Sequence, residues 1–186
     1  MAGGHDQLWK DLIRAFPIDF LRLVDGELAA QLELSALSLE PVEEFLDRPT
    51  GAGRRMDLAG NARSLEGAEV LVHVEIELRF RDTVPPRLLL YNRLLGLRRR
   101  RPVHTIVLYL HGGPSGTEVS EFVEMSCGRE VGRLTYRSFA LSRARAENFL
   151  SRSEPLAWAF AVCVCEVEIV TAFAVHVSPE SQRPTI

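Results

Sequence analysis

The chain has 186 residues, of which 46% are hydrophobic and 25% are charged, and its formal net charge is −3. This composition is typical of one ordinary soluble domain, and it excludes a collagen-like, disulfide-scaffold or wholly disordered chain. A sequence pI near 6.0 also argues against nucleic-acid binding through bulk positive charge.

The N-terminal part of the chain is predicted to be mainly helical. Asp6 is a candidate N-cap for a first helix, because Leu8 and Ile13 follow it at helical spacing. The pattern of a helix returns over Phe20–Leu34, and the glycines within Pro49–Arg54 indicate a turn. These features place two helices before the first clear strand.

Two consecutive strands are predicted next, over Arg55–Arg63 and Glu69–Leu78, and the polar connection between them indicates a hairpin. The second strand alternates, so its residues divide between two faces of the sheet. One face holds Val70, Val72, Val74 and Ile76, and the other holds Leu71, His73, Glu75 and Glu77. The hairpin therefore brings acidic side chains to one face.

The second half of the chain is predicted to continue with both element types. They are a helix over Pro85–Arg99, a central strand over His104–Leu110, an antiparallel pair over Glu121–Cys127 and Glu130–Leu141, a helix over Ala144–Phe160 and a strand-like stretch over Ala161–Val177. The apolar segment near the C-terminus is not expected to cross a membrane, because it contains Glu166, Glu168 and His176.

Three segments resemble familiar motifs but lack residues that those motifs require. The run His111-Gly112-Gly113 resembles the oxyanion loop of an α/β-hydrolase, but no G-x-S-x-G element follows it. The same glycines lack the lysine of a phosphate-binding loop. The pair Cys163 and Cys165 has no second pair of ligands at zinc-site spacing. A glycine turn and structural cysteines in a reducing compartment are the simpler interpretation.

Three carboxylates form the strongest chemical pattern, namely Asp57, Glu75 and Glu77. If the two predicted strands pair as a hairpin, Asp57 and Glu75 approach each other, and Glu77 lies on the same face as Glu75. Carboxylates gathered in this way repel one another unless a cation lies between them, and hard oxygen ligands select Mg²⁺ or Mn²⁺. The chemistry indicated is hydrolysis of a phosphodiester. The alternative is that these glutamates only form the solvent-exposed face of an amphipathic strand.

Six short segments occur in the chain order of a known family: His5–Leu12 (HDQLWKDL), Arg55–Leu58 (RMDL), Leu71–Glu75 (LVHVE), Arg87–Tyr91 (RLLLY), Pro102–Leu108 (PVHTIVL) and Pro155–Ala159 (PLAWA). Together they resemble the recombination-promoting nuclease and transposase family, a branch of the PD-(D/E)XK nucleases. The family's corresponding segments read HDxxFKxLL, R-x-D-L, LLIHVE, RRMFRY, PVYPIVL and NPLAWAL. The resemblance covers residues 5–161, and each segment alone is short.

The resemblance implies an α/β fold with an α-β-β-β-α-β core, in which a mixed central sheet is flanked by helices, with extra C-terminal strands and a helix. It makes Asp57 and Glu75 the ligands of Mg²⁺ or Mn²⁺. It also places Arg87 and Tyr91 on a helix beside the site, where they would contact phosphates together with Arg55. His5 and Lys10 match the N-terminal segment, but no role is assigned to them.

Two departures from the family pattern bear on activity. The family has E-x-Q, and the wider superfamily E-x-K, where this chain has Glu75-Ile76-Glu77. Glu77 is therefore either a third catalytic carboxylate, acting as a ligand or general base, or the mark of an inactive copy. The resemblance also ends before Val162. We expect one nuclease-like domain over residues 1–161 and an atypical extension over 162–186, for which a truncated or frame-shifted gene end is a hypothesis.

The charge distribution leaves room for a nucleic-acid partner despite the acidic total. Residues 61–110 hold 5 acidic and 9 basic groups, a net charge of +4, and include the run Arg98, Arg99, Arg100 and Arg101. This run either contacts backbone phosphates near the carboxylates or complements the dipole at a helix C-terminus.

The function expected is that of a cytoplasmic, metal-dependent DNA endonuclease-like protein, linked to DNA recombination or transposition. DNA is its expected partner, and neither a membrane nor a small-molecule cofactor is expected. The alternatives are a catalytically inactive DNA-binding or interaction domain and a decayed family member. The oligomeric state is left open.

Overall fold

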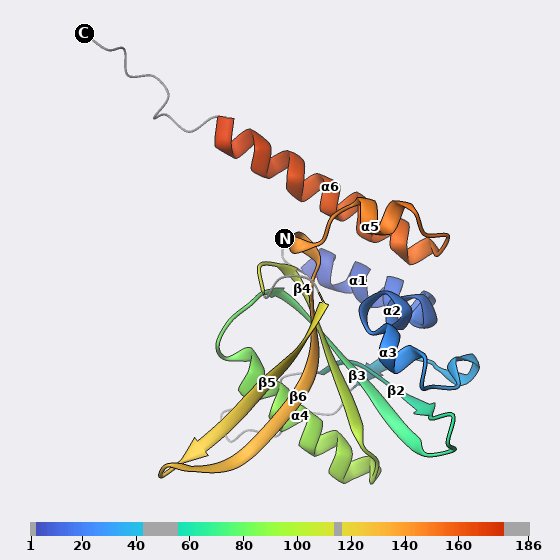
Figure 1. The fold of residues 1–186 in the computed structure, drawn as a ribbon, viewed down its shortest axis with the longest axis vertical. Helices are drawn as coiled ribbons and strands as arrows, with labels where there is room; N and C mark the ends of the chain where they lie inside the picture. The colour runs from blue at the N-terminus through green and yellow to red at the C-terminus, as the bar shows by residue number, and fades with distance from the viewer. Residues whose placement is uncertain (1–2, 43–55, 114–116, 177–186) are drawn as a thin grey trace.

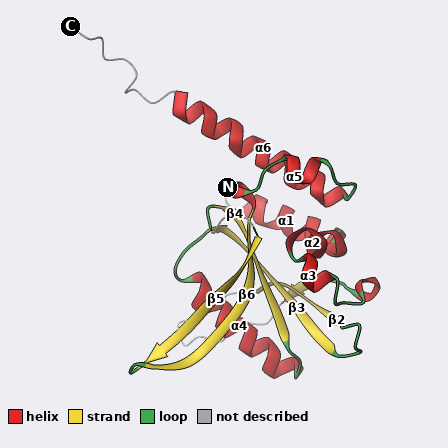
Figure 2. Cartoon of the chain, in the orientation of Figure 1, coloured by secondary structure: helices red, strands yellow, loops and turns green. Residues whose placement is uncertain are grey.

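The computed structural model describes residues 3–42, 56–113 and 117–176. The described chain forms a mixed α/β protein in which a six-stranded sheet is flanked by helices (Figures 1 and 2). The order of strands across the sheet is β1-β2-β3-β4-β6-β5. The expectation of a mixed sheet covered by helices is thus confirmed.

The first predicted helix is α1 (Gly3–Ala15), which begins before Asp6, so Asp6 lies within the helix rather than at its cap. Its buried face is formed by Trp9 and Ile13, whereas Leu8 is 53% exposed. Leu8 shares the helical spacing of the segment but does not belong to the buried face of α1. A helix presents only part of its circumference to the sheet, and Trp9 has the larger apolar surface to bury.

The helix predicted over Phe20–Leu34 is interrupted. The structure has α2 (Pro17–Val24), a single turn α3 (Gly26–Ala29) and a 3₁₀ turn η1 (Leu34–Ala36). The break occurs because the Asp25 carboxylate accepts a hydrogen bond from the Leu28 N–H at 3.1 Å, which starts a new helix. The turn predicted over Pro49–Arg54 lies outside the described residues.

The predicted hairpin is present. Strands β1 (Glu40–Val42), β2 (Met56–Arg63) and β3 (Glu69–Arg79) form an antiparallel meander. The β2–β3 ladder runs from the pair of Arg63 and Glu69 to the pair of Leu58 and Val74. This register places Asp57 opposite Glu75, directly beyond the last pair of the ladder.

Helix α4 (Val84–Arg99) then crosses to β4 (Val103–His111), which pairs with β3 in parallel. Both elements agree with the sequence prediction to within a few residues. Strands β5 (Thr117–Ser126) and β6 (Arg129–Ala140) form the predicted antiparallel pair, and β6 joins β4 in parallel. The C-terminal ends of β3, β4 and β6 therefore meet at one edge of the sheet.

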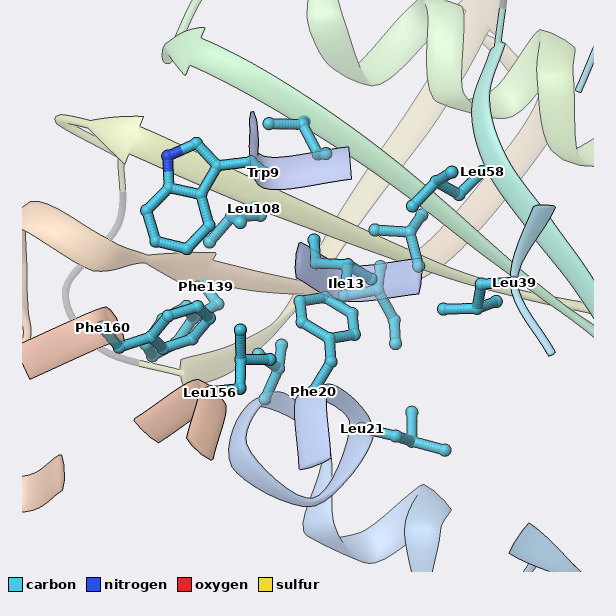
Figure 3. Close-up of a cluster of buried hydrophobic side chains, with 14 of the residues drawn as sticks. Trp9, Ile13, Phe20, Leu21, Leu39, Leu58, Leu108, Phe139, Leu156 and Phe160 are labelled. Atoms are coloured by element: carbon cyan, nitrogen blue, oxygen red, sulfur yellow. The ribbon is translucent and has the colours of Figure 1, made fainter. Parts of the chain in front are cut away.

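The two faces of the sheet are covered differently. Helices α1, α2 and α3 and the C-terminal helices pack on one face, where Phe20, Leu108 and Phe160 are fully buried (Figure 3). Helix α4 covers the other face, where Leu88 packs with Tyr109. Because side chains alternate along β3, Glu75 and Glu77 lie on the α4 face.

The C-terminal part of the chain is helical: η2 (Leu141–Arg143), α5 (Glu147–Leu150) and α6 (Pro155–His176). The predicted strand over Ala161–Val177 is thus wrong, because α6 continues through the boundary placed at residue 162 (Figure 1). The sequence of this segment alternates and is rich in β-branched residues, and both features favoured a strand. Within the described residues, no helix combines the length and apolar character needed to cross a bilayer.

Candidate active site

Asp57 and Glu75 face each other where the β2–β3 ladder ends. The backbone N–H of Asp57 donates to Glu75 Oε1 at 3.2 Å, and the backbone N–H of Ile76 donates to Asp57 Oδ2 at 2.7 Å. Carboxylate oxygens thus take the place of the carbonyl acceptors that would continue the ladder. The predicted approach of these two side chains is present in the fold.

The surroundings of Asp57 disfavour the ionised form of its carboxyl group. Burial and the nearby Glu75 carboxylate raise the pKa of Asp57 from 3.8 to about 6, against the opposing effect of Lys10. A carboxylate that is desolvated beside another carboxylate favours its protonated form. A cation bound between the two would remove that penalty.

Lys10 supplies one compensating charge. Its Nζ lies 2.7 Å from Asp57 Oδ1, and both side chains are largely shielded from solvent. Lys10 is the only lysine of the chain and comes from α1, on the opposite side of the sheet from α4. Its role was missed in the sequence because 47 residues separate it from Asp57, and no spacing rule joins them. The one available signal was a single lysine within an otherwise arginine-only basic set.

Glu75 is held by a buried chain of polar groups. The side chain of Glu75 is 3% exposed, and its Oε1 lies 3.1 Å from Nε2 of the fully buried His73. His73 Nδ1 lies 3.4 Å from Thr105 Oγ1, which also accepts a hydrogen bond from Asn92 at 3.0 Å. The arrangement that satisfies these groups has Nε2–H donate to the carboxylate and Nδ1 accept from the hydroxyl. His73 thereby fixes the orientation of Glu75.

The Glu77 carboxylate is paired with an arginine side chain. The Arg87 guanidinium of α4 forms an ion pair with Glu77 and lies 3.6 Å from Glu75 Oε2. Glu75 and Glu77 therefore share one arginine, rather than converging with Asp57 on a common point. Among the residues that the structure describes, no group of three or more His, Cys, Asp or Glu side chains is arranged to hold a metal ion.

The donor set can nevertheless accept a hard divalent cation. Mg²⁺ is commonly bound through one or two carboxylates, with waters and substrate phosphates completing its octahedron. Asp57 and Glu75 provide two such carboxylates, and their mutual repulsion is the electrostatic condition that a cation relieves. The residues present therefore fit a magnesium or manganese ion with two protein ligands, and Glu77 is not needed as a third.

The residues predicted to bind nucleic acid are spread over α4. Arg87 lies beside the carboxylates, and its Cζ is 5.9 Å from the centroid of the Tyr91 ring. Tyr91 is only 1% exposed and packs edge-on against His73, so the expected contact of Tyr91 with a phosphate is replaced by a supporting role. Arg55 lies outside the described residues.

The arginine run Arg98–Arg101 lies at the other end of α4 from Arg87. Eleven residues of helix separate Arg87 from Arg98, which corresponds to about 17 Å. Arg101 pairs with Glu69 at 2.5 Å and donates to Asn61 Oδ1 at 2.8 Å, at the start of β3. The run is therefore not next to the carboxylates, and phosphate binding there stays a prediction about a separate surface.

Comparisons with family models, curated proteins and solved structures gave no match for this chain. The fold and the site together define a mixed α/β protein that carries a buried carboxylate pair between two cations.

Proposed function

We propose that this protein is a metal-dependent endonuclease-like domain that hydrolyses phosphodiester bonds of DNA. The observation that carries the proposal is the facing pair Asp57 and Glu75, which is buried, mutually repulsive and flanked by Lys10 and Arg87. Paired carboxylates of this kind, next to cationic side chains, are suited to a metal ion and a phosphate group.

The order of elements supports the proposal. From α1 to β4 the chain runs α-β-β-β-α-β, counting α1 to α3 as one helical segment, and β1 to β4 are neighbours in that order. This arrangement agrees with the core that the family resemblance implies. Asp57 and Glu75, which the resemblance implies are the two ligands, lie on its second and third strands. A link to DNA recombination or transposition is part of the same proposal.

Each residue has a defined task. Asp57 and Glu75 would hold Mg²⁺ or Mn²⁺, which stabilises charge on a phosphoryl oxygen and lowers the pKa of water. Lys10 holds the Asp57 carboxylate in place, and His73 does the same for Glu75. Arg87, whose side chain is 17% exposed, is positioned to contact a phosphate oxygen once it turns from Glu77.

The experiment is a plasmid-nicking assay in Mg²⁺ and in Mn²⁺. Asp57→Asn and Glu75→Gln are expected to lose nicking by about 100-fold or more. Both variants keep an oxygen acceptor for the backbone N–H groups, which an alanine would not. Glu66→Gln is the matched control, because Glu66 is an exposed glutamate of the turn between β2 and β3. Wild-type protein without nicking in either metal contradicts the proposal.

A catalytically inactive DNA-binding domain is the second candidate. It is favoured by the ion pairs themselves, because Lys10 and Arg87 already compensate two of the three negative charges at the site. This candidate predicts DNA binding that weakens with salt and does not change in Asp57→Asn. Fluorescence anisotropy of a labelled oligonucleotide between about 50 and 200 mM salt measures this binding, and salt-dependent binding without nicking in either metal favours the inactive domain.

A further inference from the structure

A hollow lies on the α4 face, beyond the C-terminal ends of the parallel strands β3, β4 and β6. It has a volume of about 690 Å³, and its lining includes Phe80, Pro85, Glu118, Ser120, Tyr136 and Arg143. Phe80 directly follows β3, Pro85 lies in the first turn of α4, and Arg143 follows β6. Ligands of α/β sheets bind preferentially outside the carboxyl ends of the strands, which is where this hollow lies.

Strand register places the hollow on the same face as the carboxylates. Glu77 pairs with Tyr109 across β3 and β4, and Ser120 pairs with Tyr136 across β5 and β6. Tyr109 connects the two regions, because it pairs with Glu77 in the sheet and its ring contacts that of Phe80. Phe80 follows Glu75 by five residues, which is about 17 Å of extended chain. The hollow is thus within a few nucleotides of the proposed cleavage site.

The lining is suited to a flat heterocycle. Phe80 is 44% exposed, and its ring packs edge-on against Tyr109 with centroids 5.6 Å apart. Tyr136 and Phe122 contribute further aromatic surface. This aromatic wall offers a stacking surface to a planar ligand.

The charges at the hollow favour a base over a phosphate. Two carboxylates, from Glu118 and Glu121, and one guanidinium, from Arg143, belong to the lining. Glu121 is paired with Arg133 at 2.5 Å, whereas Glu118 remains on the α4 face of β5. A carboxylate repels phosphate but accepts a hydrogen bond from the exocyclic amino group of a base.

We infer that the hollow bounded by Phe80, Tyr136 and Glu118 binds one unstacked nucleobase of the nucleic acid whose backbone lies at Asp57 and Glu75. The identity of the ligand as a nucleic acid rests on the proposed function. The base enters with its ring against Phe80, while its phosphates stay outside near Arg87. A base inside a duplex must first be flipped out of its stack, so single-stranded or unpaired DNA binds in preference to continuous duplex.

The test is binding of a single-stranded oligonucleotide that contains 2-aminopurine, measured by its fluorescence in the presence of EDTA so that no cleavage occurs. Wild-type protein should quench the fluorescence on binding, and it should bind the matching duplex more weakly. Phe80→Ala is expected to weaken single-strand binding about tenfold and to abolish the quench. Phe80→Trp, which keeps a stacking surface, should retain both properties.

The matched control is Trp158→Ala, because Trp158 is an exposed aromatic residue of α6, outside the hollow. It should leave binding and quenching unchanged. Equal binding by wild type and Phe80→Ala, or quenching that Trp158→Ala removes, overturns the inference. Failure of the proposed function gives a different result: wild type would quench 2-aminopurine through Phe80 and yet show no nicking in Mg²⁺ or Mn²⁺. Nicking without a Phe80-dependent quench would refute the base site alone.

Discussion

Replacing Asp57 by asparagine is expected to make the protein more stable at neutral pH. The folded protein raises the pKa of Asp57 from 3.8 to about 6, through burial and the charge of Glu75. The folded state therefore binds this proton more tightly than the unfolded state does. Between these two pH values, stability falls as pH rises, because ionisation costs more in the folded chain. Asparagine stays neutral and avoids that cost.

The magnitude follows from the two pKa values. Each pKa unit corresponds to about 1.4 kcal/mol, so the ionised Asp57 costs the folded state about 3 kcal/mol at pH 7. Below the unfolded value of 3.8 both states hold the proton, and the cost vanishes. Asp57→Asn should thus match wild type near pH 4 to within about 1 kcal/mol and exceed it by about 3 kcal/mol at pH 7.

Urea unfolding at several pH values, followed by circular dichroism, measures this difference. The m-value, which is the slope of the unfolding free energy against urea concentration, should be equal in the two proteins. Equal m-values mean that both proteins expose the same amount of surface on unfolding. Asp11→Asn is the control, because Asp11 is an exposed residue of α1. A variant that is less stable than wild type at pH 7, or a stability difference that is constant from pH 4 to 8, would refute the reasoning.

Four further outcomes are expected. Adding Mg²⁺ at pH 7 should raise the melting temperature of wild type and not that of Asp57→Asn, because only the paired carboxylates bind the ion; equal shifts contradict a site there. Lys10→Met should raise the pKa of Asp57 above about 6, as measured by carboxyl NMR titration, and an unchanged midpoint contradicts the ion pair. Glu77→Gln releases its arginine partner, so DNA affinity measured by anisotropy should increase; a decrease would assign Glu77 a direct role. Gly60→Ala should destabilise the fold by about 3 kcal/mol or more in thermal denaturation, because its Cβ would lie 1.9 Å from a carbonyl oxygen, whereas Gly26→Ala, with open space around it, should not.

The elements with a strict period were predicted well from the sequence. The alternation of β3 defined a strand, and its hairpin partner fixed the register that sets Asp57 against Glu75. The apolar run of β4 and the prolines that open α4 were equally informative. These signals are local, and the fold did not override them.

Two segments were not predicted correctly. The residues after Ala161 alternate along the sequence and are rich in β-branched types, which favoured a strand, yet they continue α6. The break at Asp25 depended on a side chain that caps its own chain three residues later, within an otherwise helical pattern.

The site was predicted only in part, because its cations come from distant elements. Local spacing related Glu75 to Glu77, and the hairpin added Asp57. Neither could show that Arg87 turns to Glu77, or that Lys10 reaches Asp57 from the other side of the sheet. Ion pairs between elements depend on how the helices pack on the sheet, and a hydrophobic period shows which face of an element is buried but not which charged residues of two elements meet.

Two backbone amides at the end of the β2–β3 ladder donate directly to the site's carboxylates, so their NMR signals report on the site. The N–H groups of Asp57 and Ile76 donate to carboxylates instead of carbonyls. A hydrogen bond to a charged acceptor is stronger than one to a neutral acceptor, so the amide proton of Ile76 senses whether Asp57 is ionised. The amide resonance of Ile76 should shift with a midpoint near pH 6, together with Asp57. Two backbone signals in an NMR spectrum would then follow proton and cation binding at the site without any label on a side chain.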